Sequence, residues 1–447
     1  MDQDRDALSF SRRSFMRTVA AAGAGMAAGG AIAQEQPADR AKRPAELKIA
    51  IIGTGSQGRN LLMNCLKIPA VRFVAVCDCW PYSQTYAANI LKKYDQPVNV
   101  YADYQDMLDK EKSLDAVIVA TPDWIHAEQT IACLQAGKHV YCEKEMANTI
   151  EGARSMVKAA KETGRLLQIG HQRRSNPRYW HAMKMIYNDR MLGRITHCFG
   201  QWNRSRRQDI GWPKDQEMDK ATLARYGYET MDQFRNWRWY KKYGGGAMAD
   251  LGSHQVDVFG WFLKARPTAV MAAGGLDYYK DREWYDNVMA IYEYATEHGV
   301  VRAFYQVLNT TSYGGFYEAF MGDEGTVEVS EDTRRGLLFR ELEAKRKDWE
   351  NEANKIDSMN REAIQLKIGE TLKSDGTPTP EGQRLLEEIK KPVHQLHLEN
   401  FFGAIRDGTP LTCPPDVAFE TCVAVLRANE AVAAGKRLEF KAEDFRA

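Results

Sequence analysis

The feature that most constrains the fold is a glycine-rich turn between a short apolar run and a helix-prone segment. The run Lys48–Ile52 has the length and composition of a buried strand, and it leads directly into a G-x-G-x-x-G turn, Gly53–Gly58. Residues 59–66 then have the pattern of a helix. A strand, this turn and a helix in that order are typical of a domain that binds a dinucleotide at a parallel sheet.

Within this turn each glycine has an expected task. Gly53 permits the tight turn, Gly55 lets the backbone approach a pyrophosphate, and Gly58 allows the helix to pack closely on the strand. The helix N-terminus offers unpaired N–H groups to the phosphates. Ser56 and Gln57 stand between the glycines, so we predict that they also contact the cofactor.

A second predicted strand, Val71–Cys77, ends at Asp78, which lies 20 residues after Gly58. An acidic residue at about this distance accepts hydrogen bonds from the ribose hydroxyls of NAD and repels the 2′-phosphate of NADP. Residues 79–82 include no Arg or Lys that could accommodate such a phosphate. We therefore predict NAD as the cofactor, with NADP as the less favoured alternative.

Strand-like and helix-like runs alternate over residues 46–170, which predicts a doubly wound parallel sheet, or Rossmann domain, in this part of the chain. Such sheets bind ligands at the carboxyl ends of their strands. Two further strands are expected at residues 115–120 and 139–142. The residues that follow them, and that we predict to lie at the cofactor site, are Thr121, Pro122, His126, Glu143 and Lys144.

The segment after Gly170 carries candidates for substrate chemistry. Gly244–Gly246 precede residues 247–262, which we predict to form a helix with Asp250 and His254 on one face, at positions i and i+4. Oxidation of a carbinol needs a base for the hydroxyl proton; a histidine suits that task, and a carboxylate can orient it. Asp250 and His254 are therefore predicted as catalytic residues. Weaker candidates for substrate contacts are His171, Arg174, Trp237, Arg238 and Tyr240.

The N-terminus has the layout of an export signal. Arg12 and Arg13 precede an Ala/Gly-rich stretch that ends in a small-residue cleavage site at residues 31–33. We predict a twin-arginine signal peptide over residues 1–33, a linker over 34–45, and export of the folded protein by the twin-arginine machinery to the periplasm or another exported location. Because no dinucleotide pool exists outside the cytoplasm, such an enzyme would have to retain its NAD tightly.

Bulk properties exclude several other classes of protein. The net charge of +1 gives no reason to expect nucleic acid as a partner, and beyond the N-terminal stretch no apolar run approaches the ~18 residues of a membrane span. We therefore predict no stable membrane insertion. The eight cysteines form no C-x-x-C pair and have no further Cys or His at ligand spacing, so we also predict no metal site.

Several motifs follow one another along the chain. They are Gly53–Gly58, Thr121-Pro122 with His126, Ala136–Val140, Glu143-Lys144, Gly244–Gly246 with Asp250 and His254, and Gly322 with Gly325-Thr326. Their order resembles that of the Gfo/Idh/MocA oxidoreductases, and the resemblance covers almost the whole mature chain. It implies a Rossmann domain followed by an α+β domain with an open, mainly antiparallel sheet, and activity on sugars, inositols or related polyols.

The resemblance also implies roles for individual residues. Lys144 corresponds to the catalytic lysine of the family, Asp250 to the substrate-binding aspartate, and His254 to the proton-transferring histidine. Glu145 departs from the family pattern, which has Pro after this lysine, and it adds a carboxyl group near the expected site.

The rest of the chain is divided by its pattern and by this resemblance. Residues 171–392 are expected to form the α+β substrate and oligomerisation domain, with antiparallel strands between 268 and 330 and a charged, helix-prone insertion over 331–392. Residues 393–447 are expected to return as helices to the Rossmann domain. The exposed sheet face typical of the family implies a homo-oligomer, either a dimer or a tetramer.

Three functions remain in competition. The first is an oxidoreductase that transfers hydride between a sugar or polyol and a tightly retained NAD. A second carbonyl compound then reoxidises the NADH on the enzyme. The second is an NAD-dependent glycoside hydrolase. It would oxidise a glycoside transiently at C3, expel the aglycone by elimination, add water to the resulting double bond and reduce the carbonyl again. The third is a non-catalytic sugar-binding protein, against which Lys144, Asp250 and His254 argue together.

Overall fold

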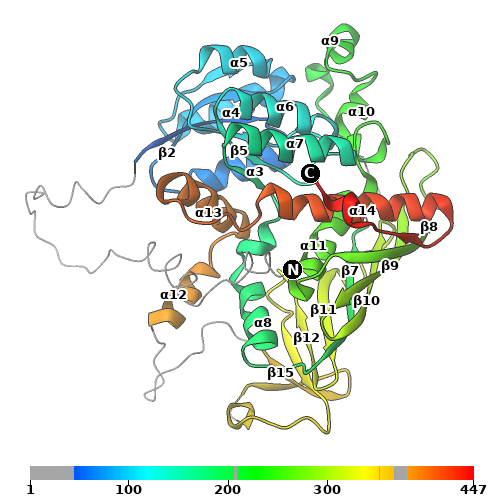
Figure 1. The fold of residues 1–447 in the computed structure, drawn as a ribbon. Helices are drawn as coiled ribbons and strands as arrows, with labels where there is room; N and C mark the ends of the chain where they lie inside the picture. The colour runs from blue at the N-terminus through cyan, green and yellow to red at the C-terminus, as the bar shows by residue number, and fades with distance from the viewer. Residues whose placement is uncertain (1–44, 206–208, 352, 367–379) are drawn as a thin grey trace, which may run out of the picture.

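The computed structural model describes residues 45–205, 209–351, 353–366 and 380–447. A parallel sheet flanked by helices forms one domain, and a large sheet covered by helices on one side forms the other (Figure 1). The predicted signal peptide, residues 1–33, lies outside the described residues, as does the predicted linker except for its last residue. Among the helices that the structure describes, none has both the length and the apolar composition needed to cross a membrane.

The N-terminal domain contains a six-stranded sheet in which every strand pair is parallel. The strand order is β3-β2-β1-β4-β5-β6, which confirms the predicted doubly wound arrangement. The strands are apolar along most of their length because helices cover both faces of the sheet. Their bounds are β1 Leu47–Ile52, β2 Val71–Cys77, β3 Asn99–Tyr101, β4 Ala116–Val119, β5 His139–Cys142 and β6 Leu167–Ile169.

Alternate residues of β1 show how the helices divide between the two faces. Ile49 and Ile51 pack with the helix that follows the glycine turn, whereas Ala50 and Ile52 pack with helices on the other face. The helices of this domain are α3 Ser56–Cys65, α4 Pro81–Lys93, α5 Tyr104–Lys110, α6 Asp123–Gln135 and α7 Ile150–Thr163.

The second domain is built on a ten-stranded sheet with the order β14-β15-β13-β12-β11-β7-β10-β9-β8-β16. All of its pairs are antiparallel except β7 with β10, so the predicted mainly antiparallel sheet is confirmed. The strands are β7 Ile195–Asn203, β8 Pro267–Gly275, β9 Asn287–Thr296, β10 Gly299–Leu308, β11 Phe316–Gly322, β12 Gly325–Val329, β13 Leu337–Arg340, β14 Lys355–Ser358, β15 Arg361–Gln365 and β16 Leu438–Glu439.

One face of this sheet is covered by α8 (Pro177–Tyr187), α11 (Ser253–Leu263) and part of the C-terminal helix α14 (Pro415–Ala434). Phe259 and Phe262 of α11 lie fully buried against Phe320 of β11 in the largest core of the protein. The structure also describes several short helices. They are η1 Gln172–Ser175, η2 Lys214–Gln216, α9 Lys220–Arg225, α10 Met231–Arg235, η3 Trp237–Trp239, the π-helical turn η4 Met248–Gly252, η5 Asp348–Asn351 and η6 Ala442–Phe445.

The prediction of a helix-prone insertion over residues 331–392 is wrong for most of its described part. Strands β13, β14 and β15 extend the edge of the large sheet, and only α12 (Pro380–Glu388) and a short 3-10 turn are helical. Leu338 and Ile364 face each other across β13 and β15 and are buried in the main core. Pairing with an existing sheet edge therefore outweighs the helix propensity of the charged residues around them.

The C-terminal helices contact both domains. Helix α13 (Val393–Asp407) places Phe401 and Phe402 against the Rossmann sheet, on the same face as α3. Helix α14 (Pro415–Ala434) contributes to two cores, because Phe419 belongs to the Rossmann core and Val425 to that of the large sheet. Figure 1 shows α14 lying between the two sheets.

Candidate active site

The glycine turn at the start of α3 leaves room for a ligand. A Cβ atom at Gly58 would lie 1.9 Å from the carbonyl oxygen of Gly53, so close packing requires glycine there. At Gly55, by contrast, a Cβ would meet nothing within 4 Å. Helix α3 has no side-chain cap and no acidic residue in its first turn. Its N–H groups therefore point into open space without an internal acceptor, which fits a bound pyrophosphate.

Asp78 stands at the end of β2, as predicted, and it also shapes the turn. Its carboxylate accepts hydrogen bonds from Thr54 N at 2.7 Å, Thr54 Oγ1 at 3.0 Å and Trp80 N at 2.9 Å. Burial raises the pKa of Asp78 above its usual value, against the effect of these hydrogen bonds. The contact of Asp78 with a ribose remains a prediction, and the structure adds a role in holding the glycine turn.

The ends of the next strands are tied to the turn and to α6. Gln57 Nε2 donates to Glu143 Oε1 at 3.0 Å, which links the first turn of α3 to the end of β5. The Thr121 hydroxyl donates to Gln129 Oε1 at 2.7 Å, and Pro122 is the N-cap of α6. These residues lie at the carboxyl edge of the sheet, where the sequence placed them.

The structure corrects the prediction that His126 contacts the cofactor. The residue is only 1% exposed, and its ring nitrogens lie 2.8 Å from the carbonyl oxygens of Thr121 and Glu145. Because a carbonyl oxygen only accepts, both nitrogens must donate, which requires the protonated ring. Burial opposes that charge, but Cys142 and Asp123 outweigh it and raise the pKa of His126 to about 10. His126 is therefore an internal clamp that holds the loop carrying Lys144.

Lys144 and Asp250 come from different domains and meet at the centre of the site. Lys144 Nζ lies 2.5 Å from the main-chain carbonyl oxygen of Asp250 and 3.5 Å from its Oδ1. The peptide bond between Lys144 and Glu145 is cis although Glu145 replaces the usual proline. The ammonium group of Lys144 thus reaches the second domain from the loop after β5.

Two arginines share the carboxylate of Asp250 with Lys144. Arg204 Nη2 donates to Oδ2 at 3.0 Å, and Arg238 Nε donates to Oδ1 at 2.9 Å. Burial works against ionisation of this carboxyl, but the three cations outweigh it and hold the pKa of Asp250 well below its usual value. Asp250 is therefore ionised throughout the physiological range.

His254 does not pair with Asp250, which corrects a second expectation. Residues 248–252 form a π-helical turn, so the α-helix begins only at Ser253, and the Asp250 oxygens are taken by the cations described above. The ring of His254 lies instead beside Trp202, with 5.1 Å between ring centroids. Its Nδ1 is buried and has no hydrogen-bond partner among the described residues.

A second histidine faces His254 across the site. The ring centroid of His171 lies 6.3 Å from that of His254, and both nitrogens of His171 lack a partner among the described residues. Burial lowers the pKa of His171 to about 4, and burial together with the Lys144 charge lowers that of His254 well below its usual value. Both rings are neutral near pH 7. Because buried polar atoms are rarely left unpaired, these nitrogens are candidates for hydrogen bonds to a ligand or to water.

The weaker substrate candidates separate into two groups. His171 and Arg238 belong to the cluster, whereas the structure corrects the predictions for Arg174 and Tyr240. Arg174 Nε donates to both carboxylate oxygens of Asp257 at 2.9 Å, inside the protein. The Tyr240 hydroxyl donates to Asp232, and Trp237 packs against the guanidinium of Arg238 at 4.2 Å.

The sequence did not reveal two residues of this cluster, Trp202 and Arg204. Both stand at the carboxyl end of β7, and Trp202 lies on the face of the sheet that α11 covers. Their position at a strand end within an aromatic and Arg-rich segment was the available signal. Their distance along the chain from Asp250 and His254 gave no local pattern to connect them.

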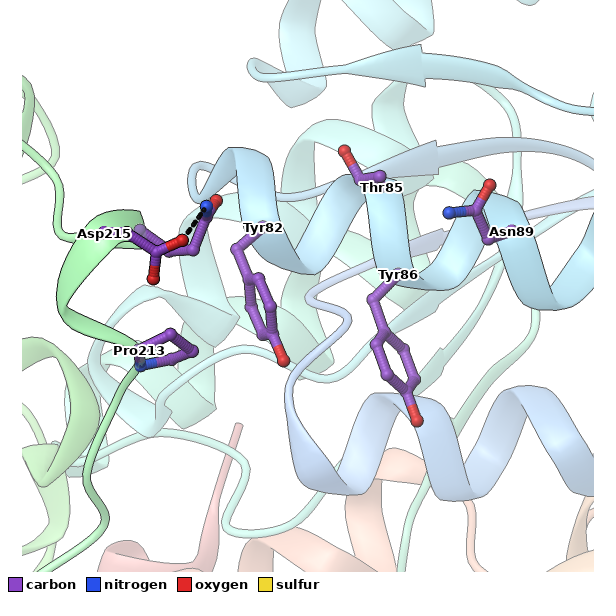
Figure 2. A pocket seen from close by; sticks show the side chains of 7 residues that line it. Tyr82, Thr85, Tyr86, Asn89, Pro213 and Asp215 are labelled. Atoms are coloured by element: carbon purple, nitrogen blue, oxygen red, sulfur yellow. Dashed lines mark hydrogen bonds between the residues drawn. The ribbon is translucent and has the colours of Figure 1, made fainter.

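A separate hollow lies on α4, outside this cluster. It has a volume of about 390 Å³ and contains none of the catalytic candidates (Figure 2). The Tyr82 and Tyr86 rings point into it from α4, and the Arg59 guanidinium lies 4.5 Å from the Tyr86 ring centroid. Its lining residues are Tyr82, Thr85, Tyr86, Asn89, Pro213, Asp215 and Gln216.

Comparison with known sequences finds relatives that match about a third of this chain. The chain is 33% identical over 150 residues to 4-carboxy-2-hydroxymuconate-6-semialdehyde dehydrogenase of Sphingobium sp., a match that covers 34% of this chain and 45% of that protein. It is 33% identical over 156 residues to inositol 2-dehydrogenase of Pseudomonas savastanoi pv. phaseolicola, covering 34% and 45%. The matches thus span less than half the length of these curated relatives.

Known structures resemble the whole fold. Levoglucosan dehydrogenase in complex with NADH and levoglucosan has a TM-score of 0.66 at 18% identity, covering 89% of this chain and 99% of that one. Aldose-aldose oxidoreductase from Caulobacter crescentus has a TM-score of 0.65 at 20% identity, covering 88% and 100%. At these identities the likeness shows the fold.

Two family models divide the chain as its two sheets do. Residues 47–171 match the NAD-binding Rossmann fold of an oxidoreductase family, and residues 180–328 match the GFO/IDH/MocA C-terminal domain. The motif order, both sheets and both models agree, and the chain belongs to the Gfo/Idh/MocA family of oxidoreductases.

Proposed function

We propose that this protein oxidises or reduces a sugar or polyol at a CH–OH carbon, with NAD held tightly at the glycine turn. The observation that carries the proposal is the contact of Lys144 with Asp250 near two buried, neutral histidines. Both nitrogens of His171 and Nδ1 of His254 have no partner among the described residues. The open N-terminus of α3 supports the cofactor assignment. We further propose export through the twin-arginine route to the periplasm, on the strength of the N-terminal sequence alone.

The side chains support a division of labour at the reacting hydroxyl. Lys144 Nζ donates a hydrogen bond to the hydroxyl oxygen and stabilises the negative charge that develops on it. His254 is neutral at physiological pH and accepts the hydroxyl proton. Asp250, together with the cations that contact it, positions the substrate. Bound NAD supplies the hydride acceptor. In the reverse direction His254 returns the proton to the carbonyl oxygen.

Residues around the turn would hold the cofactor. The uncapped N–H groups after Gly55 are proposed to bind the pyrophosphate, and Asp78 at the end of β2 to accept hydrogen bonds from the ribose. Thr121, Pro122 and Glu143 stand at the neighbouring strand ends. Retention of NAD would let the exported enzyme restore its redox state with a second carbonyl compound.

The experiment begins with protein purified without added nucleotide, in which bound NAD is identified by mass and absorbance. Free sugars and polyols are then supplied, followed by a second carbonyl compound. Formation of bound NADH, followed by its reoxidation by the carbonyl compound, supports the proposal. Aglycone release from aryl glycosides without net NADH would replace it with the redox-neutral glycosidase, and protein free of nucleotide would contradict tight retention.

Export is tested separately by cell fractionation. The native chain is expected in the periplasm, and the Arg12→Lys, Arg13→Lys variant in the cytoplasm. Equal distribution of the two proteins would contradict the twin-arginine assignment.

The open face of the large sheet, with exposed Met271, Met289 and Val300, supports assembly into a dimer or tetramer. Light scattering measures the oligomeric state.

Replacement of His254 by Asn is expected to lower kcat about 10²- to 10³-fold, because the hydroxyl proton loses its acceptor. Bound NAD should persist in the variant, since His254 lies on the second domain. In the native enzyme the low pKa of His254 should keep this base active well below pH 6.5. A His254→Asn variant with native kcat, measured under saturating sugar, would remove His254 from proton transfer.

A further inference from the structure

Three cations converge on a single carboxylate at the proposed reaction centre. The Asp250 oxygens lie 3.5 Å from Lys144 Nζ, 3.0 Å from Arg204 Nη2 and 2.9 Å from Arg238 Nε. One negative charge thus faces three positive charges.

Two neighbouring acids have partners of their own. Asp123 is buried and accepts a hydrogen bond from Gly245 N, and burial raises its pKa. Glu143 Oε1 accepts a hydrogen bond from Gln57 Nε2 on the cofactor side. Among the described residues, Asp250 is the carboxylate that forms ion pairs with Arg204 and Arg238.

Two other arginines show what a purely internal pair looks like in this protein. The side chain of Arg173 is 1% exposed and pairs with Glu318, and that of Arg174 is 11% exposed and pairs with Asp257. Each therefore has its own buried carboxylate, as internal arginines usually do.

Arg204 and Arg238 differ from them in exposure and in unused donors. Their side chains are 38% and 29% exposed, and they share one carboxylate. Arg204 uses Nη2, while its Nε has no partner among the described residues. Arg238 uses Nε for Asp250, which leaves its two terminal nitrogens for another acceptor. A guanidinium fork matches a carboxylate or a phosphate better than a neutral hydroxyl.

We propose that Arg204 and Arg238 bind an anionic group on the substrate, so that the enzyme acts on acidic sugars in preference to neutral ones. The inference rests on the proposed oxidoreductase function and names the substrate class of the same site. Because Asp250 contacts both arginines and Lys144, the anion lies on the same sugar unit as the reacting hydroxyl. The anionic group is a carboxylate, as in a uronic acid, or a phosphate ester.

The test compares kcat/KM of the NAD-loaded enzyme for glucose, glucuronate and glucose 6-phosphate, together with their methyl glycosides where available. We expect one anionic series to exceed the neutral series by about 10- to 100-fold, the effect of one hydrogen-bonded charge. The comparison of glucuronate with glucose 6-phosphate identifies which anion the arginines take. Added salt should reduce the preference. Equal values for neutral and anionic sugars would overturn the inference and leave the proposed function intact.

Variants assign the preference to its residues. Arg204→Gln and Arg238→Gln are each expected to reduce the anionic-to-neutral ratio about tenfold, and Arg238→Lys to restore part of it through charge alone. Arg302→Gln is the matched control, because Arg302 pairs with Glu293 on the open face of the sheet. An unchanged ratio in both glutamine variants would contradict the assignment.

A binding measurement separates this inference from the proposed function. Calorimetry on the NAD-loaded protein with glucuronate, glucose 6-phosphate and glucose needs no turnover. Preferential binding of an anionic sugar without turnover would support the arginine site and reject the oxidoreductase. Equal binding of all three would overturn the inference, whatever the turnover.

Discussion

Replacement of Lys144 by Met is expected to lower the rate of hydride transfer about 10³-fold while bound NAD is retained. The methionine side chain has nearly the same length but no charge. It therefore keeps the packing of the loop and removes the only ammonium group that meets Asp250 in the described cluster. The oxygen of the reacting hydroxyl then loses both a hydrogen bond and a stabilising charge.

Single-turnover absorbance of NADH on the loaded protein measures this step without product release. Lys144→Arg is the informative companion, because it keeps the charge but places a wider planar group against the Asp250 carbonyl. We expect it to recover only part of the rate. A methionine variant within tenfold of the native rate would show that Lys144 does not act on the reacting hydroxyl.

Replacement of Glu145 by Gln is expected to stabilise the protein at alkaline pH and to have little effect at acidic pH. Glu145 is fully buried, with Oε1 accepting from Met146 N at 2.8 Å and Oε2 without a partner among the described residues. Burial raises the pKa of Glu145 to about 8, with a smaller contribution from the Asp123 charge. The folded protein therefore holds a proton that the unfolded chain releases above its ordinary pKa.

The sign of the effect follows from proton binding. From about pH 4.5 to about pH 8 the folded state binds one more proton than the unfolded state, so the native stability falls by up to about 1.4 kcal/mol per pH unit. Glutamine does not titrate and escapes this loss. Denaturant unfolding at about pH 5 and about pH 9 measures the difference between the two proteins.

Glu162→Gln provides the control, because Glu162 is exposed on α7 beside Lys158 and should show no such difference. A Glu145→Gln variant with the same stability change at both pH values would contradict the buried, neutral state of Glu145. That state also places an uncharged acid next to Lys144 in the chain, so Glu145 adds no negative charge beside this lysine near neutral pH.

Local pattern was sufficient for the cofactor end of the molecule. The turn at Gly53–Gly58 and the strand that ends at Asp78 follow from short-range rules, because each depends on residues within one strand, turn or helix. The parallel sheet followed from the alternation of strand and helix. Lys144 and Asp250 could be named, but their contact across the domain boundary was visible only in the fold.

Long-range pairing explains what the sequence could not predict. Arg204 and Asp250 are far apart in the chain, and nothing near either residue identifies the other as its partner. His126 looked like a cofactor ligand because it follows a strand end, yet two carbonyl groups occupy its ring. Strand β13 is apolar but only four residues long, and β15 is largely polar, so their pairing at the edge of the sheet was not apparent from the sequence.

Helix α14 bears on when the active site can first exist during synthesis. The proposed site has two halves, one with Lys144 and the other with Asp250 and His254. Both are translated long before Pro415–Ala434. Since that helix is part of both cores, its contacts with the two domains can form only after nearly the whole chain has been made. A nascent or C-terminally truncated chain would therefore have every proposed catalytic residue but would lack the helix that packs on both domains.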